Sequence, residues 1–237
     1  EAIGDLPYRK YIIGGGSNIL MTQPVDGLVI VNKLKGITAE QEDEQYVWLK
    51  VASGEVWHDL VLYAIEKGLG GIENLALIPG TAGASPMQNI GAYGVEAKET
   101  IESVTGWHWQ ERRFVTYTNA ECKFGYRDSI FKHELKDKVF ITSVVYRLTK
   151  RPVYNTSYGA ITQELEQMGV SELSVRSIAE AVMRIRTSKL PDPKIIGNAG
   201  SFFKNPTIAK VQFEELKQRY NDMPCYPVND QLVKVPA

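Results

Sequence analysis

The chain has 237 residues, 43% hydrophobic and 23% charged, and its 27 basic and 28 acidic residues give a formal net charge of -1. This length allows one large domain or two smaller ones with a packed core, and the ordinary composition excludes a largely disordered chain. The balanced charge argues against a surface that follows a nucleic-acid backbone, because such a surface needs an excess of basic residues.

The first part of the chain predicts short strands joined by loops. A strand at residues 8–13 leads into the loop Gly14-Gly15-Gly16-Ser17-Asn18, and further strands are expected at residues 28–31 and 46–52. This arrangement brings a glycine-rich turn directly after a strand.

A helix and a second glycine-rich region follow. We expect the helix to open at Gly54, because apolar residues recur at helical spacing from Trp57 to Ile65, and Gly68 stands where a left-handed cap belongs. Residues 68–94 then hold seven glycines, which excludes one regular element and allows at most short helical turns near residues 87–90. Such a run indicates backbone held close to a ligand.

The second half predicts antiparallel strands and two helices. Alternating apolar residues favour strands at 103–109, 113–118 and 139–148, each with one face toward water. A helix is expected at residues 175–185, and a looser helical stripe is formed by Ile208, Val211, Phe213 and Leu216. Without regular βαβ spacing, this order indicates an α+β fold.

The cysteines and histidines suggest no metal site. Cys122 and Cys225 lie far apart and lack companions at metal-ligand spacing, so we expect no disulfide, no metal and a reducing, cytoplasmic setting. Cys122 is expected to be a small buried hydrophobe. The three histidines, His58, His108 and His133, are expected to be surface or core residues, because no carboxylate or cysteine arrangement surrounds them in the sequence. No apolar run is long enough for a membrane span.

The two glycine-rich regions are compatible with a bound dinucleotide. Three glycines followed by Ser17 and Asn18 expose backbone N–H groups that suit a diphosphate, although the loop is neither a Walker A motif nor a dinucleotide fingerprint, since Ile19 replaces the third glycine. The alternative is a plain connecting loop. The second region, with Ser85 and Gln88, favours the cofactor interpretation because the two loops together could line a long groove.

Two further motifs carry reactive side chains. In Phe124-Gly125-Tyr126-Arg127-Asp128-Ser129, the guanidinium could bind a carboxylate in two parallel hydrogen bonds, or Arg127 could form a structural pair with Asp128. In Gly197 to Pro206, small residues surround Ser201. A hydrolase nucleophile has little support there, since no histidine is near in the sequence, and a turn serine remains the alternative.

Five of these segments occur together in one known order. The chain resembles the UDP-N-acetylenolpyruvoylglucosamine reductase family in the segments Gly14–Asn18, Asn74–Gly80, Pro86–Gly94, Phe124–Ser129 and Gly197–Pro206. The segment Tyr158-Gly159-Ala160 resembles the tyrosine loop of one subtype of that family. The resemblance runs from about Tyr11 to the end of the chain.

The resemblance implies an FAD-binding fold of the vanillyl-alcohol-oxidase kind with a partial third subdomain for the substrate. It divides the chain into residues 1–34 and 35–190, two subdomains that hold FAD, and residues 191–237, which cover the substrate. It assigns the cofactor contacts to Gly14, Gly15, Gly16, Ser17, Asn18, Pro79, Gly80, Gly83, Ser85, Gln88, Asn89, Gly91 and Tyr93.

The resemblance also implies the chemistry. NADPH reduces FAD, and hydride from flavin N5 reduces UDP-N-acetylglucosamine enolpyruvate to UDP-N-acetylmuramate, a peptidoglycan precursor. By their family positions, Arg127 is the carboxylate-binding catalytic residue and Ser201 the proton donor, while Tyr158, Lys189 and Asn205 contact the UDP-sugar. We expect a monomer without nucleic-acid partners.

Two departures from the family pattern give rise to alternatives. The opening strands and the closing segment, which brings a catalytic glutamate in the family, have no counterpart here, so we expect a chain incomplete at both ends. The missing closing segment makes a non-catalytic flavin-binding fragment one alternative. Another oxidase of the same flavin fold is a second alternative, which the Gly200-Ser201 motif disfavours.

Overall fold

The computed structural model describes residues 6–193, 195–197 and 203–237. The chain divides into two compact units, Glu1–Gly197 and Asn198–Ala237, which are considered separately below. The three-part division expected from the sequence, with boundaries at 34 and 190, stays a prediction.

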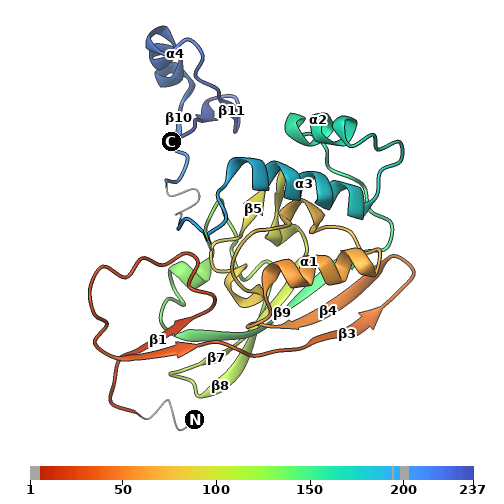
Figure 1. Cartoon of the computed structure of the whole chain (residues 1–237). Helices are drawn as coiled ribbons and strands as arrows, with labels where there is room; N and C mark the ends of the chain where they lie inside the picture. The colour runs from red at the N-terminus through yellow and green to blue at the C-terminus, as the bar shows by residue number, and fades with distance from the viewer. Residues whose placement is uncertain (1–5, 194, 198–202) are drawn as a thin grey trace. The chain divides into compact units, whose positions relative to one another are not determined.

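The larger unit is built on a five-stranded antiparallel sheet (Figure 1). In spatial order its strands are β3 (Ile37–Glu42), β4 (Tyr46–Ala52), β9 (Val139–Thr149), β7 (Ile101–His108) and β8 (Arg113–Thr118). The strands expected near β4, β7, β8 and β9 are thus confirmed, together with their antiparallel pairing. Strand β3 was not expected, because its sequence is mostly polar and nearly all of it is exposed at the sheet edge.

One face of this sheet carries the core. Val47, Leu49 and Val51 alternate along β4 toward the buried side, and Tyr146 and Leu148 of β9 join them. Figure 1 shows α1 (Trp57–Glu66) and α3 (Val175–Lys189) on the same side of the sheet. Their buried stripes are the ones predicted from helical spacing, and both belong to the same core cluster.

Helix α1 begins at Trp57, and the expected opening at Gly54 is wrong. Gly54 lies in a turn, where an added Cβ would come within 2.5 Å of the Leu34 backbone nitrogen. Gly68 follows the helix with φ +67°, the left-handed conformation expected of a C-terminal cap.

The glycine-rich region between α1 and β7 is irregular, as predicted. Its helical turns lie earlier than expected, at η1 (Glu73–Leu75) and η2 (Ala82–Ala84), and it closes with a short hairpin. The other short elements that follow helix α1 in this unit are β5 (Gly91–Ala92), β6 (Val95–Glu96), η3 (Ala97–Glu99), η4 (Ile130–Lys132) and α2 (Gly159–Gln167).

A separate two-stranded parallel sheet precedes the main sheet. Strand β1 (Lys10–Ile13) pairs in register with β2 (Leu28–Val31), and both were predicted. The first glycine-rich loop leaves β1 directly at Gly14. This places that loop at the end of a strand, as the sequence indicated.

The smaller unit has its own three-stranded antiparallel sheet. Its elements are β10 (Thr207–Ala209), α4 (Lys210–Arg219), β11 (Tyr226–Pro227) and β12 (Leu232–Lys234), with Phe213, Val233 and Val235 in its core. The predicted apolar stripe is partly wrong. Ile208 belongs to β10 and Val211 is 73% exposed, because the chain changes from strand to helix at Lys210 and so breaks the helical spacing.

Candidate functional site

A cavity of about 860 Å³ lies within the larger unit and is lined by both glycine-rich loops. From the first loop it is lined by Gly14, Ser17 and Asn18. From the second it is lined by Pro79, Gly80, Gly83, Ser85 and Gln88. Its volume is at the upper end of the range of about 300–1,000 Å³ for ligand pockets.

The two loops, which both line this cavity, also contact each other directly. A Cβ added to Gly14 would lie 2.7 Å from Thr81 Oγ1, and one added to Gly15 would lie 3.9 Å from the Gly80 Cα. Farther along, the Asn18 side-chain amide donates to the Gln88 side-chain oxygen at 3.4 Å. Loops 66 residues apart in sequence are therefore brought together, which the sequence interpretation required but could not demonstrate.

Backbone hydrogen bonds hold the second loop against the sheet and helix α1. The Trp57 N–H donates to the Gly80 carbonyl at 3.1 Å, and the Gly83 N–H donates to the Ser53 carbonyl at 2.9 Å. A Cβ on Gly83 would come within 2.4 Å of the Ser53 Cβ, so a glycine is needed there for packing as well as for access to the cavity.

Ser85 shows how a cavity residue is fixed from behind. Its hydroxyl is 2.8 Å from the Tyr146 hydroxyl and donates to the Ala82 carbonyl at 2.9 Å. Both side chains are buried, and burial raises the pKa of Tyr146, so this hydroxyl keeps its proton. The contact binds the second loop to the centre of strand β9.

The rest of the lining suits a dinucleotide with an aromatic ring system. Cationic side chains outnumber acidic ones, with Asp137 as the acidic member, and this excess favours a diphosphate. The cationic members are Arg9, Lys10, Arg112 and Lys132, and the apolar wall includes Trp107, Trp109 and Phe131. These residues carry no sequence signature, because they come from four separate segments.

The remaining predicted cofactor residues lie outside the cavity lining. Gly15 and Gly16 belong to the first loop, where Gly16 has φ +72°, and Gly91 belongs to the β5–β6 hairpin. Asn89 is buried and its amide bonds to protein atoms on three sides. Their contacts with a cofactor stay a prediction.

Tyr93, the last predicted cofactor residue, meets the predicted substrate residue Tyr158. The two rings are edge to face with centroids 5.2 Å apart, although the residues belong to different loops. Burial raises the pKa of the Tyr93 hydroxyl, while the positive charge of Arg186 on α3 opposes that shift. Arg186 was missed by the sequence interpretation, although it lies three residues before Lys189, the last residue of α3, and so shares its helical face.

Arg127 lies in a tight turn. The Gly125 N–H donates to the Asp128 carbonyl at 3.0 Å and the Asp128 N–H donates back to the Gly125 carbonyl at 3.2 Å. Arg127 itself has φ +50°. Arg127 does not line the cavity. Met87 does line it, and its carbonyl accepts the hydroxyl of Ser129, the residue after the turn. Phe131 and Lys132, which follow the turn in sequence, line it as well.

His133 is a surface residue, as expected, with its side chain 60% exposed, but a carboxylate does lie beside it in space. Its Nε2 lies 2.8 Å from Asp128 Oδ1, and this contact lowers the pKa of the Asp128 carboxyl. The pair was missed because the two residues are five positions apart, on either side of the single 3-10 turn η4, and that separation matches no regular helix or strand spacing. His108 is buried, with its Nε2 3.7 Å from Glu111 Oε1.

Two predicted residues cannot be related to this cavity. Ser201 lies outside the described residues. Asn205 belongs to the smaller unit, where its side-chain oxygen accepts a hydrogen bond from the Ala237 N–H at 3.2 Å.

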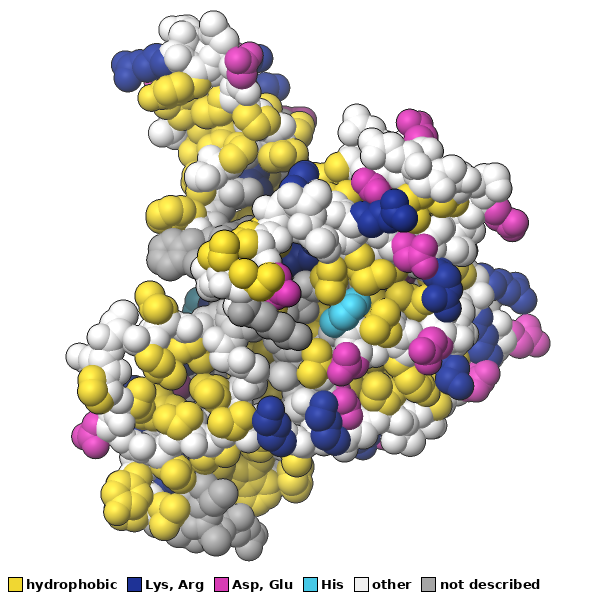
Figure 2. All heavy atoms as spheres, viewed as in Figure 1, with side chains coloured by type: hydrophobic (Ala, Val, Ile, Leu, Met, Phe, Trp, Pro, Cys, Tyr) yellow, Lys and Arg dark blue, Asp and Glu magenta, His cyan; other side chains and the backbone are white. Residues whose placement is uncertain are grey.

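The described part of the chain offers little for other site classes. Within residues 6–193, 195–197 and 203–237, no three His, Cys, Asp or Glu side chains gather as a metal site would require. Over the same residues, no helix is both long and apolar enough to cross a bilayer. Figure 2 shows basic and acidic side chains interspersed on the visible face of the larger unit.

Comparison with known proteins gives one consistent result. Residues 6–109 match the model of the FAD binding domain family. UDP-N-acetylenolpyruvoylglucosamine reductase from Flavobacterium johnsoniae is 50% identical over 230 residues, covering 97% of this chain and 68% of the relative. The namesake from Neisseria gonorrhoeae is 48% identical, covering 95% of this chain and 65% of the relative.

A solved structure agrees with these sequence matches. The crystal structure of UDP-N-acetylenolpyruvylglucosamine reductase from Thermus caldophilus superposes with a TM-score of 0.58 at 26% identity, covering 84% of this chain and 62% of that one. The chain therefore spans about two thirds of the length of the relatives it matches. The predicted α+β FAD-binding fold and the predicted flavin cofactor are confirmed. The chain belongs to the UDP-N-acetylenolpyruvoylglucosamine reductase family, a family of FAD-dependent oxidoreductases.

Proposed function

We propose that the protein reduces UDP-N-acetylglucosamine enolpyruvate to UDP-N-acetylmuramate, with NADPH as the electron donor, in the synthesis of peptidoglycan precursors. The observation that carries the proposal is the direct contact between the two glycine-rich loops that line one cavity, in a chain 50% identical to a UDP-N-acetylenolpyruvoylglucosamine reductase. When bound, FAD supplies the hydride.

The protein's part in holding FAD falls to the two loops. Gly14 to Asn18 would bind the diphosphate through backbone N–H groups, supported by the cationic lining. The second loop, from Pro79 to Tyr93, would lie along the flavin. The close approach of Gly14 to Thr81 leaves no room for a side chain at this point, which supports a backbone cradle.

Arg127 and Ser201 would act on the substrate. Addition of hydride to the terminal carbon of the enolpyruvyl group leaves negative charge beside the carboxylate, which a guanidinium stabilises by two charge-assisted hydrogen bonds. Ser201 would then give its hydroxyl proton to the carbanion at the carbon next to the carboxylate, since a carbanion is basic enough to accept it. Tyr158, Lys189 and Asn205 would hold the UDP-sugar.

We further propose that the enzyme works in the cytoplasm as a monomer, with residues 1–34 and 35–190 holding FAD and residues 191–237 covering the substrate. The cytoplasmic setting is supported by the free thiols of Cys122 and Cys225.

The test separates flavin binding from the two half-reactions. An absorbance spectrum of the purified natural protein first reports bound flavin. Anaerobic rapid mixing then follows flavin reduction by NADPH and flavin reoxidation by the enolpyruvyl UDP-sugar. We expect both reactions in the wild type, whereas Ser201→Ala should retain the first and lose the second.

Other outcomes identify the alternatives. Bound flavin without reoxidation by the enolpyruvyl substrate would indicate a non-catalytic flavin-binding protein. Fast reoxidation by oxygen with an alcohol donor would indicate another oxidase. Equal slowing of both half-reactions in Ser201→Ala would reject the proton-donor role.

A further inference from the structure

The turn that carries Arg127 has an unfavourable backbone conformation. Arg127 is the third residue of the turn from Gly125 to Asp128, and its φ of +50° lies in the left-handed region, where such turns favour glycine or asparagine. A non-glycine residue persists in this conformation only when the surrounding structure holds it there. The contacts around the turn therefore identify what fixes the arginine.

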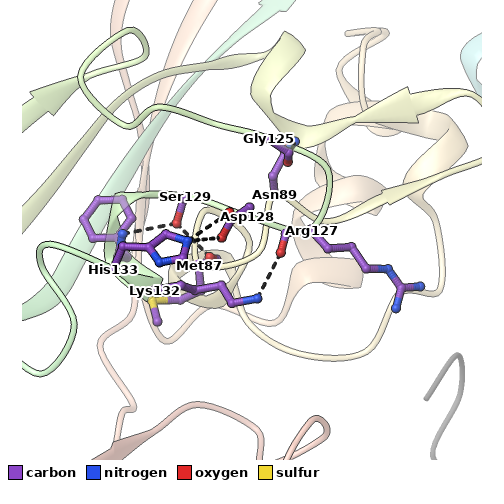
Figure 3. A network of polar contacts seen from close by, with 9 residues as sticks. Met87, Asn89, Gly125, Arg127, Asp128, Ser129, Lys132 and His133 are labelled. Carbon is purple, nitrogen blue, oxygen red and sulfur yellow. Dashed lines mark hydrogen bonds and ion pairs between the residues drawn. The ribbon is translucent and has the colours of Figure 1, made fainter. Parts of the chain in front are cut away.

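Asn89 holds the turn from one side. It is 1% exposed, and its side-chain amide donates to the Gly125 carbonyl at 3.0 Å and to Glu96 Oε2 at 3.0 Å. Its side-chain oxygen accepts the Lys98 N–H at 2.9 Å. The amide thus connects Gly125, the first residue of the turn, to Glu96 of the β5–β6 hairpin. Figure 3 shows Asn89 beside Gly125.

Ser129 holds the turn from the other side. It is also 1% exposed, and its hydroxyl donates to the Met87 carbonyl at 2.7 Å while accepting the Phe131 N–H at 3.3 Å. Met87 and Phe131 both line the cavity. One hydroxyl, two residues from Arg127, therefore connects the arginine turn to two residues that line the cavity.

The contacts on the outer side of the turn are exposed and weaker. His133 pairs with Asp128, and Lys132 Nζ donates to the Arg127 carbonyl at 3.0 Å, both with exposed side chains. Figure 3 shows the Arg127 side chain extending away from the His133–Asp128 pair. The two buried links, rather than these surface ones, are expected to fix the turn.

We propose that Asn89 and Ser129 are positioning residues that clamp the Arg127 turn to the cofactor-binding loop, so that the guanidinium meets the substrate carboxylate at a fixed place beside the flavin. The proposal deepens the proposed function and rests on it, since it assigns the clamp a part in substrate reduction. It gives Asn89 a role within the protein in place of a contact with the cofactor.

The kinetic test compares two serine variants of the natural full-length protein. Ser129→Ala removes the hydrogen bond to the Met87 carbonyl. The matched control is Ser177→Ala at the start of α3. Ser177 is 8% exposed, and its hydroxyl donates to the Ser174 carbonyl at 3.0 Å. We expect Ser129→Ala to slow flavin reoxidation by substrate about 10- to 100-fold, the effect of a displacement near 1 Å, while NADPH reduction and FAD affinity stay within about twofold. Ser177→Ala should lower the melting temperature without changing either half-reaction. Ser129→Thr keeps a hydroxyl, so its flavin should be reoxidised by substrate faster than that of Ser129→Ala.

Hydrogen exchange tests the clamp without turnover. The Gly125 and Asp128 amides, which bond across the turn, should exchange at least about 10-fold faster in Ser129→Ala than in wild type or Ser177→Ala. If Ser129→Ala does not fold, Asn89→Ala serves instead, because alanine cannot donate to the Gly125 carbonyl and adds no charge beside the Glu96 carboxylate.

The two measurements distinguish the clamp from the function. Unchanged exchange in a folded variant, or reoxidation as fast as in wild type, overturns the clamp even when the wild type is fully active. A wild type that is never reoxidised by the substrate overturns the proposed function, and the exchange rates then still decide whether Ser129 and Asn89 hold the turn.

Discussion

Gly14 and Thr81 approach so closely that a methyl group on Gly14 would lie 2.7 Å from Thr81 Oγ1 and 3.4 Å from its Cγ2. Thr81 is 7% exposed and β-branched, so its side chain has little freedom to move aside. The distance between the two glycine-rich loops is thus set by the absence of a side chain at Gly14.

Gly14→Ala should therefore weaken FAD binding. Overpacking at a contact of this kind costs about 1–3 kcal/mol, and a cost of about 1.4 kcal/mol corresponds to a tenfold rise in the dissociation constant for FAD. Flavin fluorescence measures this constant. The double variant Gly14→Ala with Thr81→Ala has room for the new methyl group and should recover most of the affinity. Equal affinities in wild type and Gly14→Ala would show that the loops open freely.

Replacing Arg127 should separate catalysis from stability. Arg127→Lys keeps the charge but loses the two-pronged hydrogen bond, so reoxidation of the flavin by substrate should slow about 10- to 100-fold. Arg127→Gly relieves the left-handed φ of +50° and should leave the free energy of unfolding within about 1 kcal/mol of wild type while removing this half-reaction. A loss of more than about 2 kcal/mol in urea unfolding of Arg127→Gly would make the arginine a structural residue.

His58 should make folding stability depend on pH. Its Nδ1 accepts the Leu77 N–H at 3.2 Å, and burial lowers the pKa of the imidazole below its ordinary value of 6.5. The unfolded chain therefore binds the proton more readily, so the stability is present above pH 6.5 and is lost as pH falls through the lower, folded pKa.

The variant His58→Asn tests this dependence. An asparagine side-chain oxygen can accept the Leu77 N–H without titrating, so the melting temperature of the variant should fall less steeply below pH 6.5 than that of the wild type. Parallel pH profiles for the two proteins would assign the dependence to other groups.

The two thiols should differ in reactivity. Cys122 is fully buried, and burial raises the pKa of its thiol from 9.0 to about 12, whereas Cys225 is only partly buried. Since the thiolate is the reactive form, a disulfide reagent should label Cys225 in the folded protein and Cys122 only after unfolding. Labelling of both residues at the same rate under native conditions would contradict the burial of Cys122.

Much of the framework could be predicted from local patterns. Alternating apolar residues located strands β4, β7, β8 and β9, and helical spacing located α1 and α3, because one buried face of a strand or helix leaves a regular signal in the sequence. Strand β3 left no such signal, since an exposed edge strand has no buried face. The stripe from Ile208 to Leu216 misled because a strand and a helix meet within it.

The sequence by itself determined that glycine-rich loops follow strand β1 and helix α1. It also determined that Arg127, Tyr93 and Tyr158 lie in loops between the regular elements. Only the tertiary structure decided that Gly14 faces Thr81, that Tyr93 meets Tyr158, and that Ser129 bonds to Met87. These pairs are 67, 65 and 42 residues apart. Contacts between irregular segments have no periodicity along the chain, so they form only where packing of the sheet and helices brings the loop ends together.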